Sequence, residues 1–203
     1  MTQYDLRYLR YAIMIADRAR EHGSPPFGAV LVSDRGRILV EGENTQGTTS
    51  DCTCHAETNL LREATRRFSP TLLSHCALYT NAEPCPMCAG AIFWSGIGRV
   101  VFGLSSEHLR ALTQNQAEHL AERCVNVLAN GTHRVEVYGP MLEEEAAKVF
   151  EIGPDSQMGS RNYLKDGFHN RRAWGYRGIV PSPRSARHEN RHRHQCQRPQ
   201  AGR

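Results

Sequence analysis

Two short stretches of the chain hold the residue types that bind a metal and move protons. They are HAE at residues 55–57 and PCPMC at residues 84–88, and each stands at an expected helix start. Cys85 and Cys88 are three positions apart, which places two sulfurs on one helical face, and a helix amino terminus favours the thiolate that binds metals. His55 can supply a third ligand, which leaves Glu57 free to handle protons. Three protein ligands leave one position open for water, as in catalytic zinc sites.

A CxxC pair taken alone also occurs in redox proteins and in closed structural zinc sites. The redox interpretation leaves His55 and Glu57 without a role. A closed structural site needs a fourth ligand, and only Cys52 or Cys54 stands nearby. Cys54 directly precedes His55, so their side chains diverge by roughly 100° if the helix has begun there. Both alternatives remain open at this point.

Hydrophobic periodicity predicts the elements that must position these residues. Helices are expected over 5–21, 55–68, 85–94, 105–124 and 141–150, and strands over 27–32, 37–44, 76–80, 99–103 and 133–138. The turn at 33–36 joins the first two strands as a hairpin, and 45–54 reads as a polar loop. The long segment 104–132 requires a crossover, so the last two strands should be parallel. The pattern predicts an α/β fold, a three-layer αβα sandwich around a central five-stranded mixed sheet.

Composition divides the 203 residues into an acidic body and a basic end. Residues 1–159 carry 14 Lys+Arg and 19 Asp+Glu, net −5, whereas 160–203 carry 11 and 2, net +9. The basic end is poor in Leu, Ile and Val, which predicts disorder because it cannot bury enough apolar surface to order itself. We expect one domain over 1–155 and a basic Arg/His-rich tail over 156–203, whose arginines near Trp174 and Tyr176 suit RNA phosphates.

Cysteine usage and hydropathy predict the cellular setting. Seven scattered cysteines are an odd number for a disulfide framework, which favours a reducing, cytoplasmic environment. No apolar run reaches the roughly 20 residues of a membrane-spanning helix, and the amino terminus lacks a signal-peptide pattern. Secretion and membrane insertion are therefore not expected.

The joint motif, HAE followed by PCPMC, resembles the HxE and PCxxC signature of the zinc-dependent cytidine deaminase superfamily, which includes cytosine and adenine deaminases. The resemblance covers the chain from its first helix to about residue 150. It implies that His55, Cys85 and Cys88 bind Zn²⁺ and that Glu57 shuttles protons. It also implies a cytidine deaminase-like fold and a homodimer.

The implied reaction is hydrolytic removal of the exocyclic amine of a nucleobase or nucleoside, with release of ammonia. The stretches around Phe27 and Trp94 are similar to guanine deaminases, so a guanine or purine substrate is favoured. Phe27 and Trp94 are expected to clamp the flat ring, with Asn44 and Ala56 beside the base. Residues 104–130 depart from guanine deaminases by lacking a Phe-Asp-Asp stretch.

Other functions remain open at the level of sequence. A tRNA-specific adenosine deaminase, with RNA held by the basic tail, is the first alternative, and a cytosine deaminase is another. The alternative that is not an enzyme is an inactive, zinc-stabilised scaffold that binds nucleic acid. Glu57 argues against the scaffold, because a purely structural metal has no use for that acid.

Overall fold

The computed structural model describes residues 3–113 and 119–151, and its centre is one five-stranded sheet. The strands are β1 (Gly28–Val32), β2 (Ile38–Glu43), β3 (Ala77–Ala82), β4 (Arg99–Leu104) and β5 (Glu136–Tyr138), in the order β2-β1-β3-β4-β5. β1 is antiparallel to β2 and β3, while β3, β4 and β5 are parallel. The mixed sheet and the parallel pairing of the last two strands confirm the sequence prediction.

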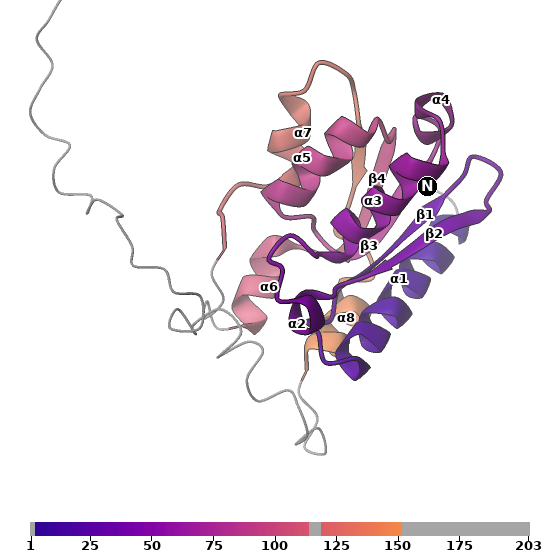
Figure 1. The fold of residues 1–203 in the computed structure, drawn as a ribbon. Coiled ribbons are helices and arrows are strands. Elements are labelled where there is room, and N and C mark those ends of the chain that lie inside the picture. The colour runs from indigo at the N-terminus through magenta and orange to yellow at the C-terminus, as the bar shows by residue number, and fades with distance from the viewer. Residues whose placement is uncertain (1–2, 114–118, 152–203) are drawn as a thin grey trace, which may run out of the picture. The chain divides into compact units, whose positions relative to one another are not determined.

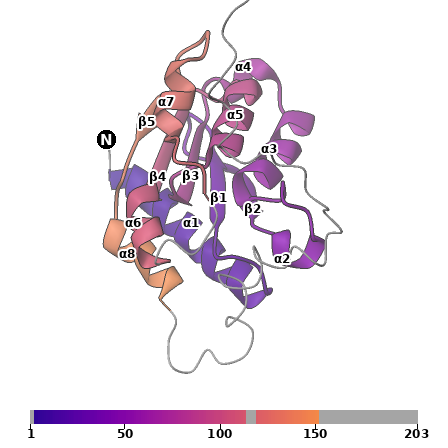
Figure 2. The same cartoon turned by 90° about the vertical axis from the view of Figure 1, so that its left-hand side faces the viewer.

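Helices cover both faces of this sheet (Figure 1). Their bounds are α1 (Gln3–Glu21), α2 (Gln46–Thr49), α3 (Ala56–Arg67), α4 (Pro70–Leu73), α5 (Pro86–Ser95), α6 (Ser106–Leu112), α7 (Cys124–Ala129), α8 (Glu143–Ala147) and the 3-10 helix η1 (Lys148–Phe150). Figure 1 shows α3, α5 and α7 on one face and α1 and α8 on the other, and Figure 2 shows the same layers from a second side. This is the expected αβα sandwich.

The alternating side chains of β1 show why both faces are covered. Strand side chains point to opposite faces in turn. Ala29 and Leu31 are buried in the core formed with α3 and α5, whereas Val30 and Val32 are buried against α1. All five residues of the strand are buried, so β1 is an interior strand that contacts both helical layers.

One end of the sheet receives the segments that carry the motifs. β3 runs directly into the turn before α5, and β4 runs into α6, so both carboxyl ends open at the same edge. Gly42 on β2 lets α3 approach closely, since a Cβ there would lie 2.3 Å from the carbonyl oxygen of Ala56. This contact holds the first turn of α3 against the sheet.

Several expected elements differ from the structure. Of the helix expected over 105–124, only α6 (Ser106–Leu112) is helical: residues 114–118 lie outside the described part of the chain, residues 119–123 are not helical, and α7 begins only at Cys124. α6 ends at Leu112, and the hydroxyl of its C-cap, Thr113, donates to the carbonyls of Leu109 and Arg110. The loop at 45–54 contains the short helix α2, and the last helix ends as η1.

The boundary near residue 155 and the basic tail at 156–203 lie outside the described residues. Within residues 3–113 and 119–151, no helix has both the length and the apolar character needed to cross a membrane.

Candidate active site

Both motif stretches begin helices, as the sequence predicted. His55 is the N-cap of α3 and Cys85 is the N-cap of α5, and each has an extended backbone with ψ near 160°. Pro86 occupies the first turn of α5, where its missing N–H costs no hydrogen bond. Cys88 lies one turn further along and is fully buried. The three donor side chains therefore project from two adjacent helix amino termini.

The three side chains converge with spacing that fits a tetrahedral zinc ion. The Nδ1 atom of His55 lies 3.6 Å from the Sγ of Cys85 and 3.5 Å from the Sγ of Cys88. With Zn–S of about 2.3 Å and Zn–N of about 2.0 Å, a tetrahedral ion separates its nitrogen and sulfur ligands by roughly 3.6 Å. All three donor atoms lie within 4.8 Å of one another, so the cluster could hold Zn²⁺.

In the described residues, no further His, Cys, Asp or Glu joins this cluster as a possible ligand. Cys52 is exposed and Cys54 is buried, and both are free thiols outside the cluster. Neither closes the site as the structural-zinc alternative requires. The protein therefore offers three ligands, the number that suits a catalytic zinc site.

The cluster presents an anion suited to a divalent cation. The pKa of Cys85 falls to about 4, first because the Cys88 thiol donates a hydrogen bond to its sulfur and then because His55 adds a hydrogen bond and positive charge. The same hydrogen bond and burial raise the pKa of Cys88. Burial alone lowers the pKa of His55, but its hydrogen bond with Cys85 and the charge of Glu57 outweigh burial and raise it.

Glu57 lies beside the cluster and is almost completely buried. Its Oε1 accepts a hydrogen bond from the Thr80 hydroxyl at 3.3 Å, and its Oε2 lies 3.5 Å from the Sγ of Cys88. Burial raises the pKa of this carboxyl above its usual value. A carboxyl that holds a proton closer to neutral pH exchanges it more readily with water or substrate.

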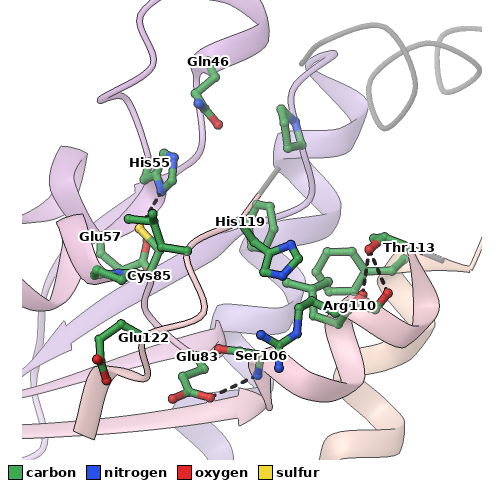
Figure 3. Close-up of a pocket in the computed structure, with 16 residues that line it drawn as sticks. Gln46, His55, Glu57, Glu83, Cys85, Ser106, Arg110, Thr113, His119 and Glu122 are labelled. Carbon is green, nitrogen blue, oxygen red and sulfur yellow. Dashed lines mark hydrogen bonds between the residues drawn. The ribbon is translucent and has the colours of Figure 1, made fainter. Parts of the chain in front are cut away.

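A pocket of about 180 Å³ opens next to His55, Glu57 and Cys85 (Figure 3). Apolar atoms make up most of its lining surface, and two of the lining side chains are phenylalanines. The rings of Phe27 and Phe150 meet at a centroid distance of 5.3 Å, with their planes inclined by 58°. The other lining residues are Pro25, Gln46, Glu83, Pro86, Ser106, Leu109, Arg110, Thr113, His119, Leu120 and Glu122. The pocket thus offers apolar surface to a flat ring.

Of the four side chains expected to contact substrate, only Phe27 lines the pocket. Asn44 is buried, and its amide exchanges two hydrogen bonds with Gln46, which lines the pocket instead. Ala56 is fully buried in the core under α3. Trp94 is 84% exposed and packs on Phe93, so it does not reach the pocket. The aromatic ring that meets Phe27 in the pocket is that of Phe150.

Glu83 joins the metal side of the pocket to its opposite wall. Its side chain is completely buried. Oε2 accepts the backbone N–H of Ser106, while Oε1 accepts the backbone N–H of Cys124 and the Nε–H of Arg123. Burial favours the neutral acid, but these hydrogen bonds outweigh it and lower the pKa of Glu83. The carboxylate therefore ties the start of α6 and the start of α7 to the turn that carries Cys85.

Sequence reasoning missed Phe150, Glu83 and the wall formed by α6. Glu83 could have been noticed, because it is an acid directly before the PCPMC stretch. Phe150 gave no such signal, since its position opposite Phe27 depends on how α8 and η1 pack on α1.

Comparison with known proteins agrees with this geometry. Residues 2–104 match the family model described as the cytidine and deoxycytidylate deaminase zinc-binding region. The chain belongs to the cytidine deaminase superfamily. Zinc is the cofactor of this deaminase family, and the cluster of His55, Cys85 and Cys88 could hold it.

Three similar proteins show how wide the substrate range of deaminases is. A probable cytosine deaminase of Schizosaccharomyces pombe is 41% identical over 148 residues, which is 72% of this chain and 90% of that protein. The guanine deaminase of Bacillus subtilis is 41% identical over 105 residues, 51% of this chain and 65% of that protein. A solved structure from a study of tRNA:A34 deaminases has a TM-score of 0.57 and 29% identity, and the match covers 71% of this chain and 99% of that one.

Proposed function

We propose that this deaminase hydrolyses the exocyclic amine of a free nucleobase, with guanine or another purine favoured, and releases ammonia. The observation that carries the proposal is a three-ligand cluster with a buried free acid, Glu57, at the edge of a small aromatic pocket. The residue roles follow from this arrangement. His55, Cys85 and Cys88 would hold zinc, and Phe27 and Phe150 would position the ring.

The protein's own residues account for the proton transfers. Zinc, when bound, supplies a Lewis acid that lowers the pKa of water toward neutrality. Glu57 accepts a proton from the attacking water and gives it to a ring nitrogen of the base. Water oxygen bonds to the amine-bearing carbon, and a second proton moves through Glu57 to the amine, which departs as ammonia. Thr80 orients the carboxyl through its hydrogen bond to Oε1.

The size of the pocket supports a base without its sugar. Pockets for drug-sized ligands are typically about 300–1,000 Å³, and this one is about 180 Å³. Deamination of adenosine in tRNA remains the alternative, supported by the tRNA deaminase among the similar structures and by the basic composition of 156–203. Cytosine is the next alternative, supported by the relative from Schizosaccharomyces pombe.

An ammonia-release screen of the zinc-loaded protein tests the proposal. The substrates are guanine, adenine, cytosine, their nucleosides and a tRNA anticodon stem-loop. We expect release from a free base, and we expect Glu57→Gln to retain zinc but lose activity by about 10²- to 10⁴-fold. Cys85→Ser should lose zinc as well. Ammonia from the stem-loop alone would establish the tRNA alternative, and none from any substrate would favour the inactive scaffold.

Truncation after residue 155 tests whether the basic tail at 156–203 holds an RNA substrate. If the basic tail holds RNA, removing it should abolish activity on the stem-loop and leave small substrates unaffected. Unchanged activity on the stem-loop would exclude a role for the tail.

We also propose that two copies associate through the outer surface of α5. Trp94 is 84% exposed and Met87 is 37% exposed on this helix, which is apolar on nearly all sides. A helix of that kind is usually covered on both faces. Sedimentation of the wild type and Trp94→Lys tests this: we expect a dimer that the substitution dissociates.

The six described cysteines are free thiols, which supports the predicted cytoplasmic setting.

A further inference from the structure

The pocket wall formed by α6 carries a guanidinium without a partner in the described part of the protein. Arg110 lines the pocket, and its side chain extends from α6 toward the middle of it (Figure 3). Within residues 3–113 and 119–151, this guanidinium makes no hydrogen bond or ion pair, whereas Arg18 and Arg99 each bind a carboxylate. Arg66 is also unpaired, but it is exposed on α3 and away from the pocket. Arg110 is half-buried.

The two acids on the same wall, Glu83 and Glu122, bind other donors and form no ion pair with Arg110 in the described residues. Glu83 accepts three N–H groups, from Ser106, Arg123 and Cys124. Glu122 accepts the side-chain amide of Asn126 at 2.7 Å and the backbone N–H of Arg123 at 3.1 Å. The donors of Arg110 are therefore available to a molecule in the pocket.

The chemistry of a guanidinium restricts what that molecule presents. It has five N–H donors in a planar fork and no acceptor, so its best partner is a pair of adjacent acceptors. A base whose amine-bearing carbon lies at the end with His55 and Glu57 turns another edge toward α6. Guanine carries O6 and N7 side by side away from its 2-amine, the pair that arginine most often binds in two-point contacts. Cytosine has one carbonyl, and the N7 of adenine adjoins the reacting amine itself.

We propose that Arg110 is a specificity-determining residue that binds the O6 and N7 edge of an oxopurine. The inference rests on the proposed function, because it assumes that the amine-bearing carbon lies beside Glu57. A phosphate group would also attract a guanidinium. The pocket is small and Arg110 lies within its lining, so a base edge fits better than a nucleotide.

Removing either the N7 acceptor of the base or the guanidinium of Arg110 tests the proposal. Guanine and 7-deazaguanine, which lacks the N7 acceptor, are compared as substrates of the wild type, Arg110→Gln and Arg110→Lys. A hydrogen bond to a charged group contributes about 1.5–3 kcal/mol, so the wild type should prefer guanine by about tenfold or more in kcat/KM. Arg110→Gln should show almost no preference, and Arg110→Lys should lose most of it because lysine lacks the fork.

The matched control is Arg66→Gln, which removes the same charge from an exposed position. It should keep the wild-type preference. The ratio of kcat/KM for guanine to kcat/KM for 7-deazaguanine reports on the contact alone, because a general loss of fold would lower kcat/KM for both substrates equally. An equal preference in the wild type and Arg110→Gln would overturn the proposal.

Binding of hypoxanthine separates this inference from the proposed function. Hypoxanthine has O6 and N7 but no amine, so its binding can be measured by calorimetry without turnover. If no base releases ammonia but Arg110→Gln weakens hypoxanthine binding about tenfold, the inference stands and the proposed function fails. If guanosine 5′-monophosphate binds tightly, and Arg110→Lys retains that binding while hypoxanthine binding does not change in Arg110→Gln, then Arg110 binds phosphate and the inference fails.

Discussion

The stability of the pocket wall depends on one buried carboxylate, and Glu83→Gln tests this with almost no change in shape. Oε1 of Glu83 accepts two donors and Oε2 accepts one, the backbone N–H of Ser106 at 3.0 Å. The amide oxygen of glutamine should keep the side with two donors, near Arg123 and Cys124. Its NH₂ group then faces the Ser106 N–H, donor against donor.

The magnitude follows from the number of hydrogen bonds lost. One hydrogen bond to a charged group contributes about 1.5–3 kcal/mol, and a buried N–H left without an acceptor costs a similar amount, so we expect a loss of about 2–4 kcal/mol in the free energy of unfolding. Arg123 is about half exposed, and Arg123→Gln should cost only about 0–1 kcal/mol. Urea unfolding followed by circular dichroism measures both.

Hydrogen exchange locates the effect of the same substitution. The amides of α6 should exchange faster in Glu83→Gln than in the wild type. The amides of α1 should exchange at the wild-type rate once the rates are corrected for the change in global stability. A Glu83→Gln protein as stable as the wild type, or a loss no larger than that of Arg123→Gln, would show that the carboxylate does not hold this wall.

Three further predictions concern the elements around the site. Gly42→Ala should lower the free energy of unfolding and weaken zinc binding measured by competition with a chelator, because its Cβ would meet the backbone of Ala56 at the start of α3. Phe150→Leu should raise KM for a purine base by about 2- to 10-fold without changing zinc content, because it removes the ring that faces Phe27. The hydrogen bond from Tyr11 lowers the pKa of Glu41 below its usual value of 4.5, so the stability that this carboxylate contributes is complete above that pH and disappears as the pH falls through the folded-state pKa. Urea midpoints of the wild type and Tyr11→Phe should therefore differ at pH 7 and converge in acid.

The metal cluster and most of the fold could be predicted from sequence because their signals are local. His55 and Cys85 stand at helix starts that short patterns mark, and the apolar spacing of α1 is visible along the chain. The parallel pairing of the last two strands followed from the length of one crossover. Each of these inferences used residues within a few turns of one another, or a single chain-length argument.

The placement of Trp94 shows how far such local reasoning extends. Trp94 stands six positions after Cys88, which is about 600° of helical rotation, so the two side chains point in directions that differ by roughly 120°. That arithmetic was available from the sequence and places the indole away from the cysteines. Its neighbour Phe93 packs on Trp94 and His133, which confirms that this side of α5 lies away from the pocket.

The opposite wall could not be predicted because it depends on contacts between distant parts of the chain. The rings of Phe27 and Phe150 are in contact although the two residues are far apart in the sequence. The buried carboxylate of Glu83 likewise accepts the backbone N–H of Cys124, which is also distant in the sequence. The two sides of the pocket therefore have different physical origins. The metal side is formed by two helix amino termini, whose donors are fixed by local backbone geometry. The α6 side is held by long-range hydrogen bonds, so substitutions at Arg110 or its neighbours can change which base fits while the three ligands and Glu57 keep their positions.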